Sequence, residues 1–186
     1  MADLDRLQQD LGFVRRTVTR EGPHSPAATY FLWSVLVLAG FALNDLRPMW
    51  VGYYWFTAGI LGGVISAYLG VRDQRRRGEI DAAVGLQWTL HWAAFMGAVL
   101  LLVVMAVRGR IGWDAFGPMV LLLLALTYFH AGLYLSAPLR WIGLLAAAGY
   151  VVVLTVPSYP WTIVGVMLAS ACGAAGVGEW RSRVAA

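Results

Sequence analysis

The sequence contains no lysine and a single cysteine, and it carries few charges of either sign. Charged residues make up 13% of the chain and hydrophobic residues 60%. A soluble domain usually has about 25% charged and about 45–50% apolar residues, so the composition excludes an ordinary soluble domain. The one cysteine, Cys172, cannot form an intrachain disulfide. Arginine used without lysine suggests the codon usage of a high-GC bacterial genome, so we expect a bacterial protein.

Sequence signatures of catalysis and transport are also missing. The chain has no phosphate-binding Gly-rich loop and no HExxH, CxxC or GxSxG motif. No Asp, Glu or Arg lies in the middle of an apolar run, where such residues usually mark a transport pathway. The first 27 residues contain no apolar segment of the kind found in signal peptides. The formal charge of +4 comes from arginines that flank apolar runs, so we expect no nucleic-acid partner.

Six uninterrupted apolar runs occupy most of the chain. About 18 apolar residues are enough for a helix to cross a ~30 Å hydrocarbon core, whereas a barrel strand would show alternating polarity. The sequence therefore predicts an all-α integral membrane protein with six transmembrane helices. The runs are Ala28–Asn44, Val51–Val71, Leu86–Val107, Ala115–Ser136, Leu139–Val156 and Trp161–Val177.

The arginines predict which way the chain crosses the membrane. Eleven of them lie in the segments before the first run, between the second and third, between the fourth and fifth, and after the sixth. Only Arg47, Arg108 and Arg110 lie on the other side. The positive-inside rule then places both termini in the cytoplasm, in a multi-pass protein of the cytoplasmic (inner) membrane. The cytoplasmic loop between the second and third helices is strongly basic, with Arg72, Arg75, Arg76 and Arg77.

Very short segments, at 45–49, 108–114 and 157–160, join the helices of each successive pair. Helices joined by so few residues are antiparallel neighbours, so we expect three antiparallel hairpins. The second helix of each pair opens near a tryptophan, at Trp50, Trp113 or Trp161. Both a threefold internal repeat and ordinary interfacial tryptophans give this pattern.

Small residues recur at every fourth position in the second and sixth runs. This spacing lets helix backbones approach closely, which is a main source of packing energy in lipid. We expect these two helices to be the most tightly packed, either within the chain or between copies in a homo-oligomer. The residues are Gly59, Gly62, Gly63, Ser66, Gly165, Ala169 and Gly173.

The N-terminal segment has the pattern of an amphipathic helix over residues 3–20. Its apolar stripe has alternating spacings of three and four. Such a helix can lie in the membrane interface or dock a partner protein or second protomer. The predicted organisation is thus an N-terminal helix and linker at 1–27, a transmembrane domain at 28–178 and a short basic cytoplasmic tail at 179–186. The stripe consists of Leu4, Leu7, Leu11, Val14 and Val18.

Two histidines, His91 and His130, lie well inside the apolar runs, where no Asp, Glu or Arg does. Each lies about six residues from the cytoplasmic end of its run, or roughly 9 Å at 1.5 Å per residue. Cys172 falls at about the same depth in the sixth run. Because imidazole is a common metal and haem ligand, the three could form a shared site. The alternative is that each histidine forms hydrogen bonds within the helix packing.

The sequence leaves three classes of function open. The first is a non-enzymatic membrane protein, acting as a sensor, an anchor or a subunit of a complex through helix packing and its N-terminal helix. Its partners would be the lipid bilayer and either further copies of the chain or a cytoplasmic protein. The second is a small-solute transporter, ligand-binding subunit or channel, which a ligand-sized cavity in mid-membrane would indicate. The third is a haem or metal protein that uses His91 and His130.

Overall fold

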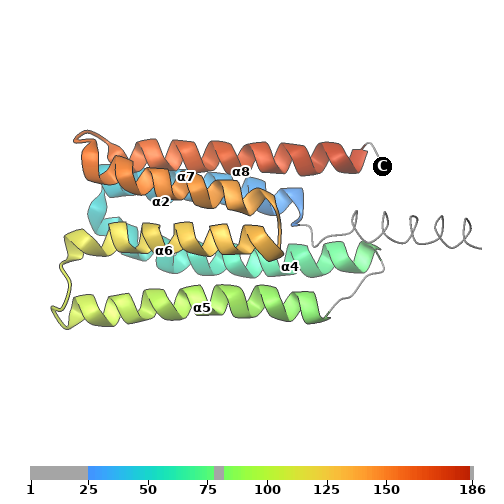
Figure 1. Ribbon diagram of the computed structural model, residues 1–186, viewed down its shortest axis with the longest axis horizontal. Helices are drawn as coiled ribbons and strands as arrows, with labels where there is room; N and C mark the ends of the chain where they lie inside the picture. The colour runs from blue at the N-terminus through green and yellow to red at the C-terminus, as the bar shows by residue number, and fades with distance from the viewer. Residues whose placement is uncertain (1–24, 78–81, 185–186) are drawn as a thin grey trace, which may run out of the picture.

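The computed structural model describes residues 25–77 and 82–184, and within these ranges the chain forms helices and short connections (Figure 1). The predicted N-terminal stripe from Leu4 to Val18 lies outside the described residues. In chain order the elements are α2 (Ala27–Leu46), the 3₁₀ turn η1 (Pro48–Trp50), α3 (Val51–Tyr54), the π-helical turn η2 (Trp55–Gly59), α4 (Ile60–Arg77), α5 (Ala82–Val107), α6 (Trp113–Tyr134), α7 (Pro138–Thr155) and α8 (Pro160–Val184).

Six of these helical stretches are long and apolar enough to cross a membrane, which confirms the six predicted apolar helices. They indicate a multi-pass membrane protein. The second stretch is longer than predicted: it runs from Pro48 to Arg76 over 29 residues, because η1, α3, η2 and α4 follow one another without a break. Prolines are the first residues of η1, α7 and α8. At this position a backbone N–H would have no acceptor within the helix, so proline costs no hydrogen bond.

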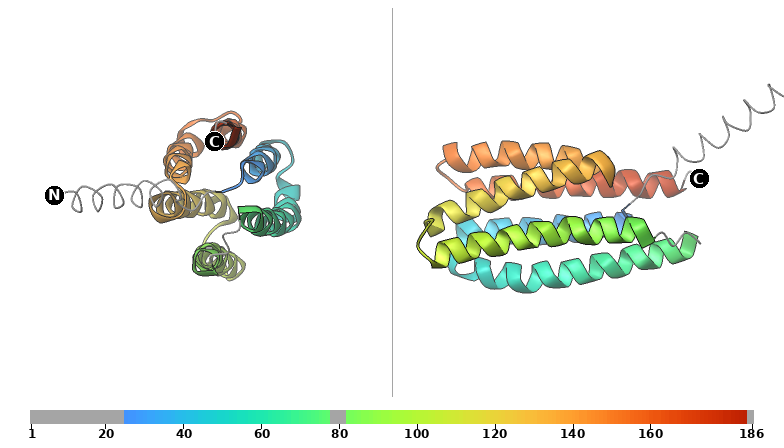
Figure 2. Two further views of the ribbon diagram at one scale, coloured as in Figure 1. Left: turned by 90° about the vertical axis from the view of Figure 1, so that its right-hand side faces the viewer. Right: turned by 60° about the horizontal axis from the view of Figure 1, so that its bottom comes forward.

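The helices lie side by side, and contacts link them in the order α4–α2–α8–α7–α6–α5 (Figures 1 and 2). Connections at 108–112 and 156–159 lie at one end of the bundle, here called the Gly109 end; the α6–α7 connection and the last turns of α4 and α8 lie at the other, the Ser136 end. Within the described residues, α4 contacts only α2 among the other spans, α5 contacts only α6, and α4 and α5 do not meet. The hydrophobic core is therefore built by α2, α6, α7 and α8.

The α2–α8 contact is the most extensive one between helices. Near the Gly109 end, one carboxylate oxygen of Asp45 accepts hydrogen bonds from the Thr162 backbone N–H (2.6 Å) and hydroxyl (2.7 Å), and so caps the start of α8. Halfway along, the Ser34 hydroxyl donates to the Ala169 carbonyl at 2.7 Å. Close approach depends on glycine, because a Cβ on Gly165 would lie 2.8 Å from the Cβ of Phe41.

The α6–α7 contact is equally close at the backbone level. A Cβ on Gly143 would lie 2.4 Å from the Phe129 backbone nitrogen and 2.8 Å from the Ala125 carbonyl oxygen. At the Ser136 end, the buried Ser136 hydroxyl shares a hydrogen bond of 3.0 Å with the Tyr30 hydroxyl. This bond ties the start of α2 to the α6–α7 connection.

We expect Gly143→Ala to destabilise the protein, by about 1–3 kcal/mol if the two helices are forced apart. The added methyl group would overlap backbone atoms of α6, which cannot move as a side-chain tip can. Thermal unfolding in mild detergent, followed by circular dichroism, measures the effect. Gly97→Ala is the matched control, because no heavy atom lies within 4 Å of the position of its Cβ. Equal unfolding midpoints for the two variants would contradict the close α6–α7 packing.

Candidate functional site

The imidazole of His91, on α5, is half-buried and forms hydrogen bonds with α6. Its Nε2 lies 3.1 Å from the backbone carbonyl oxygen of Thr127, which can only accept a hydrogen bond. Nε2 therefore carries the proton, and Nδ1 accepts a hydrogen bond from the Tyr134 hydroxyl. Both ring nitrogens of His91 are thus used within the chain, and a metal ion could bind only if one of these bonds broke.

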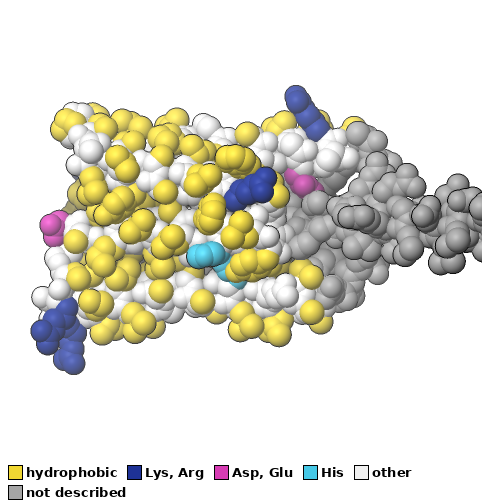
Figure 3. Space-filling model, viewed as in Figure 1, with side chains coloured by type: hydrophobic (Ala, Val, Ile, Leu, Met, Phe, Trp, Pro, Cys, Tyr) yellow, Lys and Arg dark blue, Asp and Glu magenta, His cyan; other side chains and the backbone are white. Residues whose placement is uncertain are grey.

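His130 lies beside this group on α6, one turn before Tyr134. The two α6 residues that His91 contacts, Thr127 and Tyr134, precede and follow His130 by three and four positions, so His130 lies between them on this face of α6. The Trp92 ring stands edge-on to His91, with 5.5 Å between centroids, and to Tyr128, with 5.3 Å. Figure 3 shows histidine side chains on the surface, surrounded by hydrophobic ones. The structure therefore brings the two predicted histidines together, in an aromatic setting open to lipid.

Cys172, the third predicted ligand, lies elsewhere. Its side chain is 3% exposed and belongs to the core between α2, α6, α7 and α8. α8 and α5 do not contact each other, so Cys172 and His91 face different surroundings. Over residues 25–77 and 82–184, no group of three or more His, Cys, Asp or Glu side chains is placed to hold a metal ion. The arrangement fits a structural link between α5 and α6 better than the predicted three-residue site.

The predicted small residues of α8 face α2. Gly165 packs against Phe41, Ala169 accepts the hydrogen bond from Ser34, and the Cβ position of Gly173 lies 3.7 Å from the Ser34 hydroxyl. These small residues therefore pack within the chain, which is one of the two arrangements predicted from the sequence.

The small residues of the second span divide between two faces. Gly62 is buried against Leu36 and Trp33, and the Trp33 indole N–H donates to the Ser66 hydroxyl at 2.9 Å. By contrast, Gly63 is exposed and no heavy atom lies within 4 Å of its Cβ position; at Gly59 the nearest atom belongs to Trp55 of the same span. The expected tight packing of this helix is not seen within the chain, where only 6% of its apolar window is buried against 33% for α8.

The π-helical turn Trp55–Gly59 is a feature that the sequence analysis missed. Such turns are rare and often lie at functional positions. Here the Trp55 indole rests on Gly40 of α2, where a Cβ would lie 2.4 Å from the ring. The neighbouring Tyr54 hydroxyl donates to the Leu36 carbonyl at 2.7 Å. Tyr54 of α3 and Trp55 of the turn thus both lie against α2, and the turn ends at Gly59, the first of the predicted small residues.

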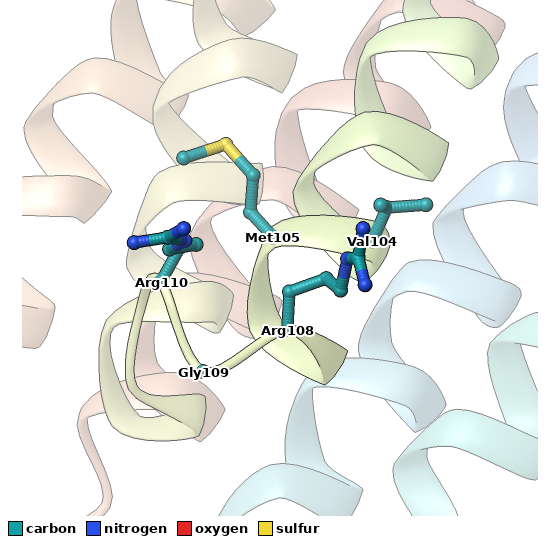
Figure 4. A pocket seen from close by; sticks show the side chains of 5 residues that line it. All are labelled: Val104, Met105, Arg108, Gly109 and Arg110. Carbon is teal, nitrogen blue, oxygen red and sulfur yellow. The ribbon is translucent and has the colours of Figure 1, made fainter.

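Two surface hollows lie at opposite ends of the bundle, and each is bordered by arginines. The one at the Gly109 end surrounds the turn after α5 (Figure 4). Gly109 has a φ of 66°, and the Arg110 N–H returns to the Met105 carbonyl at 2.8 Å, a common glycine-dependent helix end. Figure 4 shows the guanidinium groups of Arg108 and Arg110 on opposite sides of this turn. They do not converge on one ligand.

The second hollow lies at the other end of the bundle, on the last turns of α4. Three of the four predicted basic-loop residues, Arg72, Arg75 and Arg76, line it and are exposed, together with Tyr68 and Val71. They belong to the helix itself, which continues to Arg77, and not to a loop as predicted. The apolar helix carries on into its charged flank because none of the residues 71–77 is proline or glycine.

Comparisons of the chain with protein-family models, with curated proteins and with solved structures find no match.

We expect the double variant His91→Ala/His130→Ala to have the same visible absorbance and metal content as the wild-type protein. His91→Ala alone should lower stability by about 0.5–2 kcal/mol, because it removes two hydrogen bonds between α5 and α6, whereas His130→Ala should leave stability unchanged. Absorption spectroscopy, elemental analysis and thermal unfolding measure these effects. An absorption band or bound metal that is present in the wild type and lost in the double variant would restore the haem or metal hypothesis.

Proposed function

We propose that the protein is a non-enzymatic, multi-pass subunit of a membrane complex that acts through helix packing. The observation that carries the proposal is the uncovered face of α4 next to its buried one. On α4, Gly62 and Ser66 pack on α2, while Gly63 and Ala67 are exposed to lipid. A helix that is anchored on one side and lined by small residues on another is suited to receive a further transmembrane helix.

The chemistry of the membrane interior supports this proposal. His91 uses both ring nitrogens in hydrogen bonds within the chain. The centre of the bundle is filled by apolar side chains, of which Leu121, Val164 and Leu168 are each no more than 2% exposed. The two arginine-bordered hollows lie at helix ends. These features favour a packing role over the alternatives of solute transport and metal chemistry.

The occupant that best fits the α4 face is the same face of a second copy. Gly59, Gly63 and Ala67 repeat at a spacing of four, and two such stripes can cross with their backbones in contact. A symmetric pair needs only one self-complementary surface, which this helix supplies. We therefore propose a homodimer in which α4 meets its counterpart.

The proposed subunit lies in a bacterial cytoplasmic membrane with both termini inside and with its helices paired as three hairpins. The arginine distribution supports this orientation. In the proposal, the N-terminal stripe from Leu4 to Val18 provides a second contact, with a cytoplasmic protein or with the membrane surface.

We expect Gly63→Leu/Ala67→Leu to convert a dimer into a monomer, because two branched side chains would prevent close approach of the helices. Single-molecule photobleaching in vesicles at low protein density counts the copies in each complex. Gly97→Leu on α5 is the matched control, since its Cβ position also has no heavy atom within 4 Å. The proposal fails if the wild type is monomeric, or if the α4 variant dimerises as the control does.

A further inference from the structure

The second span extends further than a membrane requires. From Pro48 to Arg76 it has 29 residues, which corresponds to about 43 Å at 1.5 Å per residue. The hydrocarbon core is only about 30 Å thick. With Trp50 near one interface, the last turns of α4 reach the headgroup layer at the other. Those turns are the ones that carry the arginines.

One face of these turns carries apolar side chains first and basic side chains after them. A phospholipid has the matching order, with acyl chains followed by a charged headgroup. Tyr68 and Val71 come first and are 63% and 48% exposed. Arg72, Arg75 and Arg76 follow at helical spacings that place them on the same face, and together the five residues line the hollow at this end of α4. The guanidinium groups therefore lie above an aromatic and aliphatic surface.

The only acidic residue between Ile60 and Arg77 is Asp73. At 100° per residue it lies about 140° from Tyr68 but only about 60° from Arg76, its neighbour three positions on. Its side chain is half-buried, whereas Arg72, Arg75 and Arg76 are exposed. Three arginines against one acidic residue leave this end of α4 with a net positive charge.

We propose that this face binds the phosphate group of an anionic phospholipid. Guanidinium groups hold phosphate oxygens through paired hydrogen bonds, and clusters of arginine beside a transmembrane helix attract anionic headgroups. Tyr68 and Val71 contact the upper part of the acyl chains. The inference concerns the last turns of α4 and does not depend on the proposed dimer, whose contact residues Gly59, Gly63 and Ala67 come earlier in the span.

The arginines of the Gly109 end provide an internal comparison. Arg108 and Arg110 also border a hollow, but their guanidinium groups point to opposite sides of the turn (Figure 4). A double variant there changes the net charge by two without touching the face on α4. This double variant therefore distinguishes lipid binding at a specific site from a general attraction of anionic lipid to a positively charged protein.

The test is native mass spectrometry of the full-length protein from micelles that contain equal amounts of phosphatidylglycerol and phosphatidylcholine. The wild type and Arg108→Gln/Arg110→Gln should retain phosphatidylglycerol preferentially. Arg72→Gln/Arg75→Gln/Arg76→Gln should lose that preference at least tenfold, and each single variant should lose it severalfold. The single variants keep the test valid if the triple variant fails to fold.

Three results would overturn the proposal. The first is an unchanged lipid preference in the single and triple variants, and the second is an equal loss in the Arg108/Arg110 control. The third is displacement of the bound lipid by millimolar glycerol phosphate, because that would mean that the face recognises a soluble phosphate compound.

Discussion

Close approach of helix backbones is the constraint on which the rest of this structure depends. In lipid, apolar side chains gain little by leaving their surroundings, so helices associate through van der Waals packing and hydrogen bonds. The α2–α8 contact supplies both. Gly165 admits Phe41, Ser34 donates to the Ala169 carbonyl, and Asp45 of α2 caps the first turn of α8. Two helices that are distant in sequence thereby form the most extensive contact in the bundle.

The positions of the two proposed binding faces and of the histidines follow from how the core is built. Because α2 and α8 pair, and α6 and α7 pair through Gly143, the core is complete with four helices. Each of the other two helices contacts the core on one side. On α4, Gly62 and Ser66 contact Trp33 of α2. On α5, His91 forms a hydrogen bond with α6. Their remaining surfaces face lipid. The proposed protein contact and the proposed lipid site both lie on α4, one near its start and the other near its end.

The sequence was sufficient for the six helices, because each is a long apolar run and length and composition decide that property. It was not sufficient for the role of the small residues. The small residues of the second span and of α8 have the same spacing. Those of α8 pack on α2, whereas those of the second span are divided between α2 and lipid. Which face of a helix turns inward depends on its rotation, and the π-helical turn Trp55–Gly59, for which no simple sequence signal exists, affects that rotation in the second span.

The histidine site illustrates the same limit. Equal depth in the sequence suggested that His91 and His130 lie at one level, and in the structure His130 lies between Thr127 and Tyr134, the two α6 residues that His91 contacts. Depth alone could not show that Cys172 points into a different interface, nor that Tyr134 and Thr127 occupy both nitrogens of His91. Tyr134 follows His130 by four residues, so the two share a face of α6. The spacing of His130 and Tyr134 was the available sequence signal for a contact with His91. It could not be interpreted without knowing which face of α5 turns toward α6.

A disulfide scan in native membranes tests whether the second span carries an uncovered face for a second copy. Cys172 would be replaced by serine, and single cysteines would be placed along η2 and α4 at 59, 61, 63, 64, 67 and 68. On mild oxidation we expect crosslinked dimers at 59, 63 and 67 and little crosslinking at the other three positions. Crosslinks without this helical period, or none at any position, would contradict this prediction.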